Sequence, residues 1–118
     1  MGKHEFYTYQ AKIISVYDGD TCTAVIDLGF RISFEIKLRL AGINTPELRG
    51  EERDKGLEAR DFLGNLILNQ KVVIKTYKDS QEKYGRYLAD IYFSDSSGNQ
   101  IHVNQNMVDE GYAKPYQL

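Results

Sequence analysis

Two short segments carry the residue types that could perform chemistry. VYDGDT at 16–21 contains an Asp-Gly-Asp turn, and LRLAGINTPELRG at 38–50 ends a regular strand pattern in a polar cluster. Carboxylate, amide and backbone carbonyl oxygens suit a hard cation such as Ca²⁺ or Mg²⁺. A free glutamate can deprotonate a water and arginine forks bind phosphate, so together these groups favour phosphodiester hydrolysis. The candidate residues are Asp20, Arg39, Asn44, Thr45 and Glu47.

Each of these residues also has an ordinary structural interpretation. The Asp-Gly-Asp sequence at 18–20 is typical of a turn. Arg39 fits a solvated strand position, and Glu47 fits the start of a helix. Only the convergence of all the candidates on one part of the fold favours a functional site. The elements that position them therefore decide between the two interpretations.

The first third of the chain predicts three antiparallel strands in succession. The last of them, FRISFEIKLRL, alternates apolar and polar residues without a break, which is the period of a half-buried strand. Its apolar residues, from Phe30 to Leu40, are expected to face the core. The three strands are expected at 11–17, 21–29 and 30–40.

The hairpin between the second and third strands predicts where the candidates meet. If the chain turns near Gly29, the residue numbers of two paired residues add up to roughly 58 to 60. This register places Asp20 opposite residues 38–40 and beside Arg39. The cluster at 44–47 begins just beyond that end, so all five candidates could share one rim. Asp20 is in phase with the apolar residues of its strand, so it must lie in the preceding turn or the register must shift by one.

The rest of the chain predicts a barrel capped by helices. An apolar stripe at helical spacing runs from Ala59 to Ile67, with Asp54 as the expected N-cap, and Gly111 stops a second helix. Three strands, a helix, two strands and a helix favour a mainly β fold with α, a five-stranded OB-fold β-barrel capped by two helices. These later elements are expected at 55–69 (helix), 71–77, 85–93 and 100–103 (strands) and 104–110 (helix).

Composition narrows the chemistry. A chain of 118 residues fits one domain, 1–118, and its net charge of −2 is not the basic excess typical of a nucleic-acid binder, so a polyanion must be met by a local cluster of positive charge. One cysteine and two histidines exclude an intrachain disulfide and a thiolate zinc site. No apolar run is long enough for a membrane span or a secretory signal. We expect no membrane association and favour the cytoplasm, with a secreted mature form as the alternative.

The motifs and their order resemble those of the staphylococcal nuclease (thermonuclease) family. The resemblance covers about residues 10–116, nearly the whole chain. The motifs that carry it are VYDGDT (16–21), LRLAGINTPE (38–47), GLEA (56–59), KYGRYLADIY (83–92) and VNQNMVDEGYAK (103–114).

This resemblance implies a nuclease on an oligonucleotide-binding barrel. The family's activity would be Ca²⁺-dependent cleavage of DNA and RNA that leaves 3′-phosphates, with Mg²⁺ as an alternative cation. Asp20 resembles the carboxylate metal ligand, Thr45 a ligand through its backbone carbonyl, and Asp18 a helper through bound water. Glu47 resembles the residue that activates the attacking water. Arg39 and Arg86 resemble the phosphate-binding arginines, and the substrate-contacting residues would be Tyr84, Lys83 and Tyr116.

Asn44 departs from the family pattern. The best-studied members have a second calcium-binding aspartate there, so Asn44 keeps an oxygen ligand but removes one negative charge. The chain also ends at Leu118, where longer relatives continue into a third helix.

Two other functions compete with the nuclease. One is a non-catalytic barrel that binds nucleic acid or a protein partner, and the other is a metal-binding structural module. Non-catalytic barrels of this fold usually lose the arginines or the glutamate, and a metal-binding structural module predicts ligands without paired arginines. This chain has Arg39, Glu47 and Arg86 together, which favours the enzyme. We expect DNA or RNA as the substrate and a monomeric protein.

Overall fold

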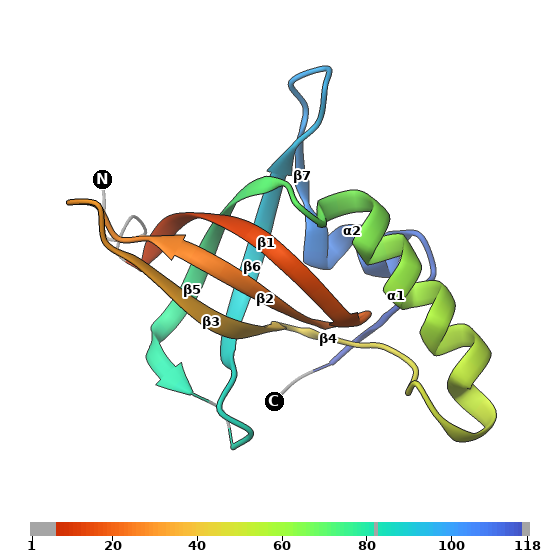
Figure 1. The fold of residues 1–118 in the computed structure, drawn as a ribbon. Helices are drawn as coiled ribbons and strands as arrows, with labels where there is room; N and C mark the ends of the chain where they lie inside the picture. The colour runs from red at the N-terminus through yellow and green to blue at the C-terminus, as the bar shows by residue number, and fades with distance from the viewer. Residues whose placement is uncertain (1–6, 82, 117–118) are drawn as a thin grey trace.

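A closed, twisted β-sheet with two helices at one end forms the fold (Figure 1). The computed structural model describes residues 7–81 and 83–116. In this part of the chain no helix is both long and apolar enough to cross a membrane.

The three-stranded meander that the sequence predicts is confirmed. β1 (Thr8–Asp18), β2 (Thr21–Asp27) and β3 (Ser33–Leu40) pair antiparallel in succession. The predicted hairpin register is confirmed as well, because Thr21 lies opposite Arg39 and the Leu40 amide donates to the Asp20 carbonyl at 2.8 Å. Gly29 lies in the connecting turn with a φ of 79°, a conformation that glycine adopts without strain.

The barrel closes through the second half of the chain. β5 (Lys71–Gln81) pairs with β1, and β6 (Tyr87–Ser94) pairs with β5. Residues Leu38–Leu40 of β3 then pair parallel to β6, which joins the two edges of the sheet. The predicted five-stranded barrel with two helices is therefore confirmed. Smaller strands complete the fold: β7 (Gln100–His102) beside β6, and β4 (Ile43–Asn44) paired with β8 (Lys114–Pro115).

The core lies between the barrel strands and the two helices. α1 (Arg53–Ile67) follows a short 3₁₀ turn, η2 (Gly50–Glu52), and buries the apolar stripe that the sequence predicts. α2 (Val103–Asp109) ends before Gly111, whose φ is 86°, as expected for a residue that stops a helix. The largest buried side chains are Ile13, Leu38, Leu40, Leu63, Ile67, Ile74, Ile91 and Met107.

The prediction for the start of β3 is wrong. Phe30 is 97% exposed, and Ile32 and Phe34 are 54% and 56% exposed, although their alternation predicted a core face. Phe30 and Arg31 have positive φ angles and belong to the turn, which the Ile32 amide closes by donating to the Gly29 carbonyl. The strand therefore starts only at Ser33, and its first half lies beyond the closed part of the barrel.

Two further sequence predictions change in the structure. The ordinary structural interpretation of Arg39, a solvated strand residue, is wrong because the residue is buried. Asp54 is not the N-cap of α1, since the helix begins at Arg53 directly after η2. Asp54 lies in the first turn, where its negative charge interacts favourably with the positive end of the helix dipole.

Candidate active site

Asp20 occupies the turn between β1 and β2 and is only 6% exposed. Its position resolves the phase problem in the sequence, because the residue lies in the turn while the hairpin keeps the predicted register. A buried carboxylate requires donors, since an ionised group without partners is strongly destabilising in the protein interior.

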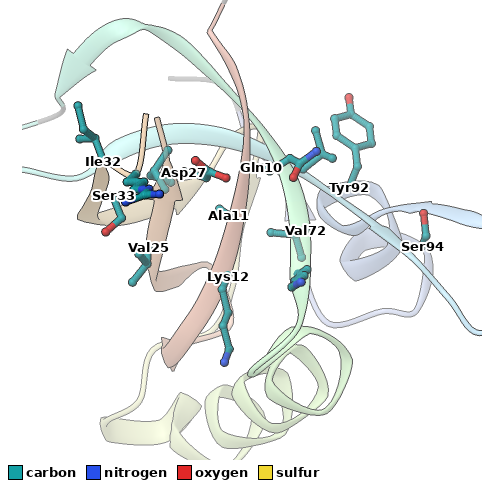
Figure 2. Close-up of a pocket in the computed structure, with 14 residues that line it drawn as sticks. Gln10, Ala11, Lys12, Val25, Asp27, Ile32, Ser33, Val72, Tyr92 and Ser94 are labelled. Atoms are coloured by element: carbon teal, nitrogen blue, oxygen red, sulfur yellow. The ribbon is translucent and has the colours of Figure 1, made fainter. Parts of the chain in front are cut away.

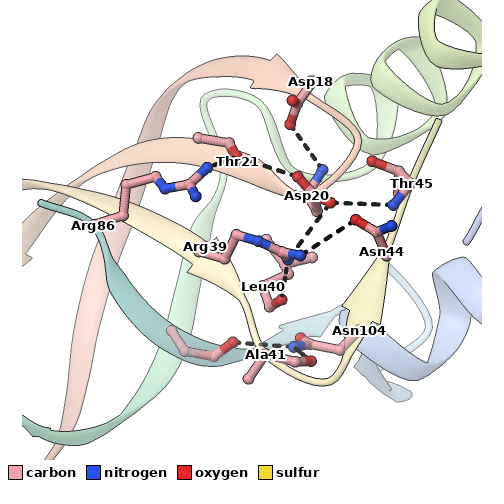
Figure 3. Close-up of polar contacts among 11 residues, drawn as sticks. Asp18, Asp20, Thr21, Arg39, Leu40, Ala41, Asn44, Thr45, Arg86 and Asn104 are labelled. Carbon is pink, nitrogen blue, oxygen red and sulfur yellow. Dashed lines mark hydrogen bonds and ion pairs between the residues drawn. The ribbon is translucent and has the colours of Figure 1, made fainter. Parts of the chain in front are cut away.

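Three donors from three segments surround the Asp20 carboxylate (Figure 3). The Thr45 amide donates to Oδ2 at 3.1 Å, and the Thr21 hydroxyl donates to Oδ1 at 3.2 Å. The Arg39 guanidinium lies 3.5 Å from Oδ2. The turn after β1, the end of β3 and the segment after β4 are thereby joined at one carboxylate.

Arg39 is held on several sides. Its Nη1 donates to the Leu40 carbonyl at 2.8 Å, and its Nη2 donates to Asn44 Oδ1 at 3.5 Å. The ring of Tyr116 lies 5.9 Å from the guanidinium carbon, within the range of a cation–π contact. These contacts bring together Arg39, Asn44 and Tyr116.

Arg86 reaches the same cluster from the other side (Figure 3). Its Nη1 donates to the Thr21 hydroxyl at 3.0 Å, and that hydroxyl in turn donates to Asp20. Tyr84 lies beside it, with its ring 5.3 Å from the Arg86 guanidinium and 5.0 Å from the Lys83 ammonium. The two arginines, 47 positions apart in the sequence, are therefore connected through Thr21 and Asp20.

Sequence reasoning missed Thr21 and Asn104. Thr21 ends the motif VYDGDT, which was the only signal for it. Asn104 is buried and uses its whole amide: Nδ2 donates to the Ala41 and Ala89 carbonyls at 2.9 and 3.0 Å, and Oδ1 accepts from the Ile91 amide at 3.0 Å. It fixes the chain just after β3 against β6, and thus positions the segment that leads to Asn44.

Asp18 and Asp20 crowd two carboxylates into one turn. The Asp20 amide donates to Asp18 Oδ1 at 3.1 Å. Burial, together with the negative charge of Asp20, raises the pKa of the Asp18 carboxyl to about 6. Negative charges held together in this way are stabilised by a nearby cation.

The oxygen donors at this rim are of the type that hard cations prefer. They are the Asp20 carboxylate, the Asn44 side-chain oxygen and the Thr45 carbonyl, with Asp18 beside them. Within residues 7–81 and 83–116, however, no three His, Cys, Asp or Glu side chains cluster to hold a metal. These oxygen donors therefore carry few formal charges.

Glu47 lies on the exposed side of the segment after β4. Its amide donates to Glu52 Oε1 at 3.0 Å, but none of the contacts recorded for the described residues joins its carboxylate to Asp20, Arg39 or Arg86. The structure brings the other candidates together and leaves the Glu47 side chain toward solvent.

Two glycines allow α1 to approach this segment closely. A Cβ at Gly56 would lie 2.3 Å from the Glu47 carbonyl oxygen, and one at Gly19 would lie 2.8 Å from side-chain atoms of Ala59 and Thr45. The GLEA motif thus supplies small residues where the helix meets the site. The spacing of Glu47 and Thr45 from the barrel depends on these contacts.

A separate cavity of about 500 Å³ lies over β1, β2 and β5 (Figure 2). It is lined by residues such as Lys12, Val25 and Tyr92, and includes none of the candidate site residues. The candidate site is a polar cluster at the barrel rim and does not coincide with this cavity.

Comparison with known proteins identifies the family. The family model described as Staphylococcal nuclease homologue matches residues 37–118, more than half of the chain. The chain belongs to this family. Uncharacterized protein MJ1439 of Methanocaldococcus jannaschii is 28% identical over 92% of this chain and 59% of its own length. The thermonuclease of Staphylococcus hyicus is 32% identical over 87% of this chain and 57% of its own length.

A shorter match links the chain to a third relative. The probable endonuclease LCL3 of Phaeosphaeria nodorum is 36% identical over 51% of this chain and 21% of its own length. The chain spans less than two thirds of the length of each of these relatives. At the level of the family, the relatives support a nuclease-like function.

The close approach of α1 leads to the first testable prediction. Gly56→Ala should destabilise the protein by about 1–3 kcal/mol, because the new methyl group collides with the Glu47 backbone. Gly64→Ala in the same helix is the matched control, since its Cβ meets nothing within 4 Å. It should stabilise by about 0.5–1 kcal/mol through helix propensity. Urea unfolding of both variants measures the difference, and equal effects would contradict the close approach.

Proposed function

We propose that this chain is a divalent-metal-dependent nuclease that hydrolyses phosphodiester bonds of DNA or RNA and leaves 3′-phosphates. The observation that carries the proposal is the connection of Arg39 and Arg86 through Thr21 and Asp20 at one rim of the barrel. Two guanidinium groups and a buried carboxylate have little structural reason to gather there, whereas guanidinium groups that bind the phosphate can stabilise the charge that develops during phosphodiester hydrolysis.

The arginines would bind and stabilise the phosphate. A guanidinium presents a planar fork of donors that matches phosphate oxygens, and its attraction grows as negative charge develops in the transition state. Arg86 is half-buried and borders the turn with Tyr84 and Lys83, which would contact the nucleotide. Arg39 is more buried and is oriented by Asp20 and the Leu40 carbonyl.

Glu47 would take the proton from the attacking water. A carboxylate suits this role when it lies within hydrogen-bond reach of the water in the substrate complex. The Glu47 side chain is exposed and is therefore accessible to a solvent water. The close contact of Gly56 with the Glu47 carbonyl fixes the backbone from which this side chain extends.

The residues that would hold the cation are Asp20, Asn44 and Thr45, assisted by Asp18. A bound Ca²⁺, or Mg²⁺ in its place, would supply a Lewis acid that polarises the phosphoryl oxygen. The chain's own contribution is an arrangement of oxygen donors, with the Asp20 carboxylate oriented by the Thr45 amide and the Thr21 hydroxyl.

One observation favours the alternative of a non-catalytic module that binds nucleic acid or a protein partner. Within the described residues, the Glu47 carboxylate makes no hydrogen bond or ion pair with Asp20 or either arginine. The two arginines that would clamp the phosphate are therefore not joined to the residue that would act as the base. A binding module needs only the clamp. Activity of variants at Glu47 and at the arginines separates the two functions.

The second prediction tests the base. Glu47→Gln should lower turnover by about 10²- to 10⁴-fold without loss of stability, because it removes the proton acceptor from an exposed side chain. Cleavage of labelled single-stranded DNA and RNA with Ca²⁺, Mg²⁺ or chelator is the measurement. Glu58→Gln, at an exposed position of α1, is the control and should keep full activity. Undiminished cleavage by the Glu47 variant, or in chelator, would contradict the mechanism.

The third prediction concerns the arginine forks. Arg86→Lys keeps the charge but loses the bidentate geometry, so turnover should fall far more than affinity if the contact strengthens in the transition state. Arg39→Lys should behave in the same way. Single-turnover cleavage gives the rate, and oligonucleotide binding in chelator gives the affinity. Arg49→Lys, at an exposed loop position, is the control. Weaker binding with unchanged turnover would favour the binding module.

The fourth prediction concerns Asn44 and the charge of the cation site. Asn44→Asp should tighten Ca²⁺ binding at least about tenfold, or ~1.4 kcal/mol. One added unit charge about 4 Å from a divalent cation is worth roughly 8 kcal/mol at an effective dielectric near 20 before desolvation, so a tenfold effect is well within reach. Asp20→Asn should abolish binding. Isothermal titration calorimetry of both variants measures the affinities, and an unchanged affinity for Asn44→Asp would exclude Asn44 as a ligand.

A further inference from the structure

The cavity over β1, β2 and β5 combines an apolar lining with cations (Figure 2). Ala11 and Val72, both buried, form part of its floor, and the more exposed Ile32 stands at one side. Its volume of about 500 Å³ lies within the usual range of ligand-binding pockets. The cations that line it are Lys12, Arg31 and Lys71. A cavity of this composition can hold a ligand that is apolar in one part and anionic in another.

Two of these cations face each other across neighbouring strands. Lys12 of β1 lies opposite Lys71 of β5 in the antiparallel ladder, and both side chains are exposed. Like charges directly opposite each other in a sheet are destabilising. Within residues 7–81 and 83–116 neither lysine makes an ion pair that would offset this repulsion. An anionic group bound between the two ammonium groups would offset it.

The outer face of the sheet connects this cavity with the candidate active site. Side chains of a strand alternate between its two faces, so Thr21, Thr23 and Val25 of β2 share the outer face. Val25 lines the cavity, and Thr21 links the two arginines of the site. The four steps between them span about 13 Å, at about 3.3 Å per residue. A polymer bound at the arginines can therefore reach the cavity along this face.

Positive charge is in excess along this route. The exposed Lys37 lies opposite Thr23, midway between the site and the cavity. Two carboxylates share the route: Asp27, whose Oδ1 accepts from the Gly29 amide at 2.8 Å, and Glu35, opposite Val25. The four cations, Lys12, Arg31, Lys37 and Lys71, outnumber these two carboxylates, although the whole chain has a net charge of −2. Charge complementarity therefore favours a polyanion as the ligand.

We propose that this cavity binds a segment of the single-stranded nucleic acid whose scissile phosphate lies at Arg39 and Arg86. The inference rests on the proposed function, because the substrate of the rim is the polymer that would reach both places. Lys12 and Lys71 bind phosphate oxygens of the strand, and the apolar lining contacts a base. Only unpaired bases present their faces for such a contact, so the ligand is a single strand.

Oligonucleotide binding in chelator tests the role of the two lysines without cleavage. Barrels that bind single strands cover about 4–16 nucleotides, so thymidine oligonucleotides of roughly 3 and 12 nucleotides are the probes. By fluorescence anisotropy, Lys12→Gln/Lys71→Gln should weaken binding of the longer probe at least about tenfold and leave the shorter probe unchanged. The slope of log Kd against log salt concentration should fall by about 1.4 for the longer probe, since each phosphate contact contributes about 0.7.

A charge-matched variant controls for the overall positive field. Lys55→Gln/Arg60→Gln removes two positive charges from α1, which lies at the other end of the barrel from the turn between β2 and β3 (Figure 1). Neither residue lines the cavity, so both probes should bind as they do to the wild type. Equal losses for both probe lengths in the lysine variant would overturn the proposal. An unchanged affinity of that variant for the longer probe would overturn it as well.

The apolar lining gives an independent test. Ile32 and Val73 line the cavity and are 54% and 36% exposed, so both can be replaced without opening the core. Ile32→Ser/Val73→Ser should weaken the longer thymidine probe at least about threefold and leave an abasic strand of equal length unchanged, because only bases contact the lining. Leu68→Ser is the control, since Leu68 is 39% exposed and lies outside the cavity. An equal loss for the abasic strand would show that no base enters the cavity.

Competition identifies the class of ligand, and cleavage separates this inference from the proposed function. Polyglutamate supplies the negative charge of an acidic protein, and displacement of the longer probe at equal charge concentration would overturn nucleic acid as the ligand. A wild-type protein that binds the longer probe through the lysines but cleaves nothing contradicts the nuclease and supports the cavity. Metal-dependent cleavage, with an affinity for the longer probe that does not depend on the lysines, contradicts the cavity alone.

Discussion

The site depends on the hydrogen bonds and the ion pair made by the buried carboxylate of Asp20. It lies in a turn of the barrel and accepts hydrogen bonds from Thr45 and Thr21, while Arg39 approaches one of its oxygens. Removing one partner of a buried ion pair typically costs about 3–5 kcal/mol, because the remaining charge is left without compensation. The segment after β4, the end of β3 and, through Thr21, Arg86 therefore keep their places relative to one another.

Close backbone packing and one buried amide support this carboxylate from outside. Gly19 and Gly56 allow α1 to contact the segment that carries Thr45 and Glu47, and a side chain at either glycine would collide with its neighbours. Asn104 satisfies three backbone groups of the chain after β3 and of β6. The polar rim is thus held by rigid elements, which is the condition for precise positioning of a functional group.

The charges of the side chains at the rim explain which ligands the rim would favour. They also explain how the rim differs from a site that binds a metal ion tightly. Two arginines supply the local positive charge that the overall net charge of −2 does not provide. Asp18 and Asp20 supply the negative charge, and the raised pKa of Asp18 reflects burial and their proximity. Asn44 adds an oxygen without adding charge. This balance of charges is the one that the proposed nuclease function requires of the rim.

The sequence by itself determined the barrel, the two helices and the register that brings Asp20 to Arg39, because strand periodicity and hairpin pairing are local properties. It indicated Arg86 only through the family resemblance, since contacts between distant segments leave no periodic signal. Tertiary structure alone decided that Thr21 links the two arginines, that Asn104 fixes the chain behind them, and that Phe34 is exposed. Alternation specifies which face of a strand is apolar, but only the neighbouring strands decide whether that face is covered, and β6 reaches β3 no earlier than Leu38.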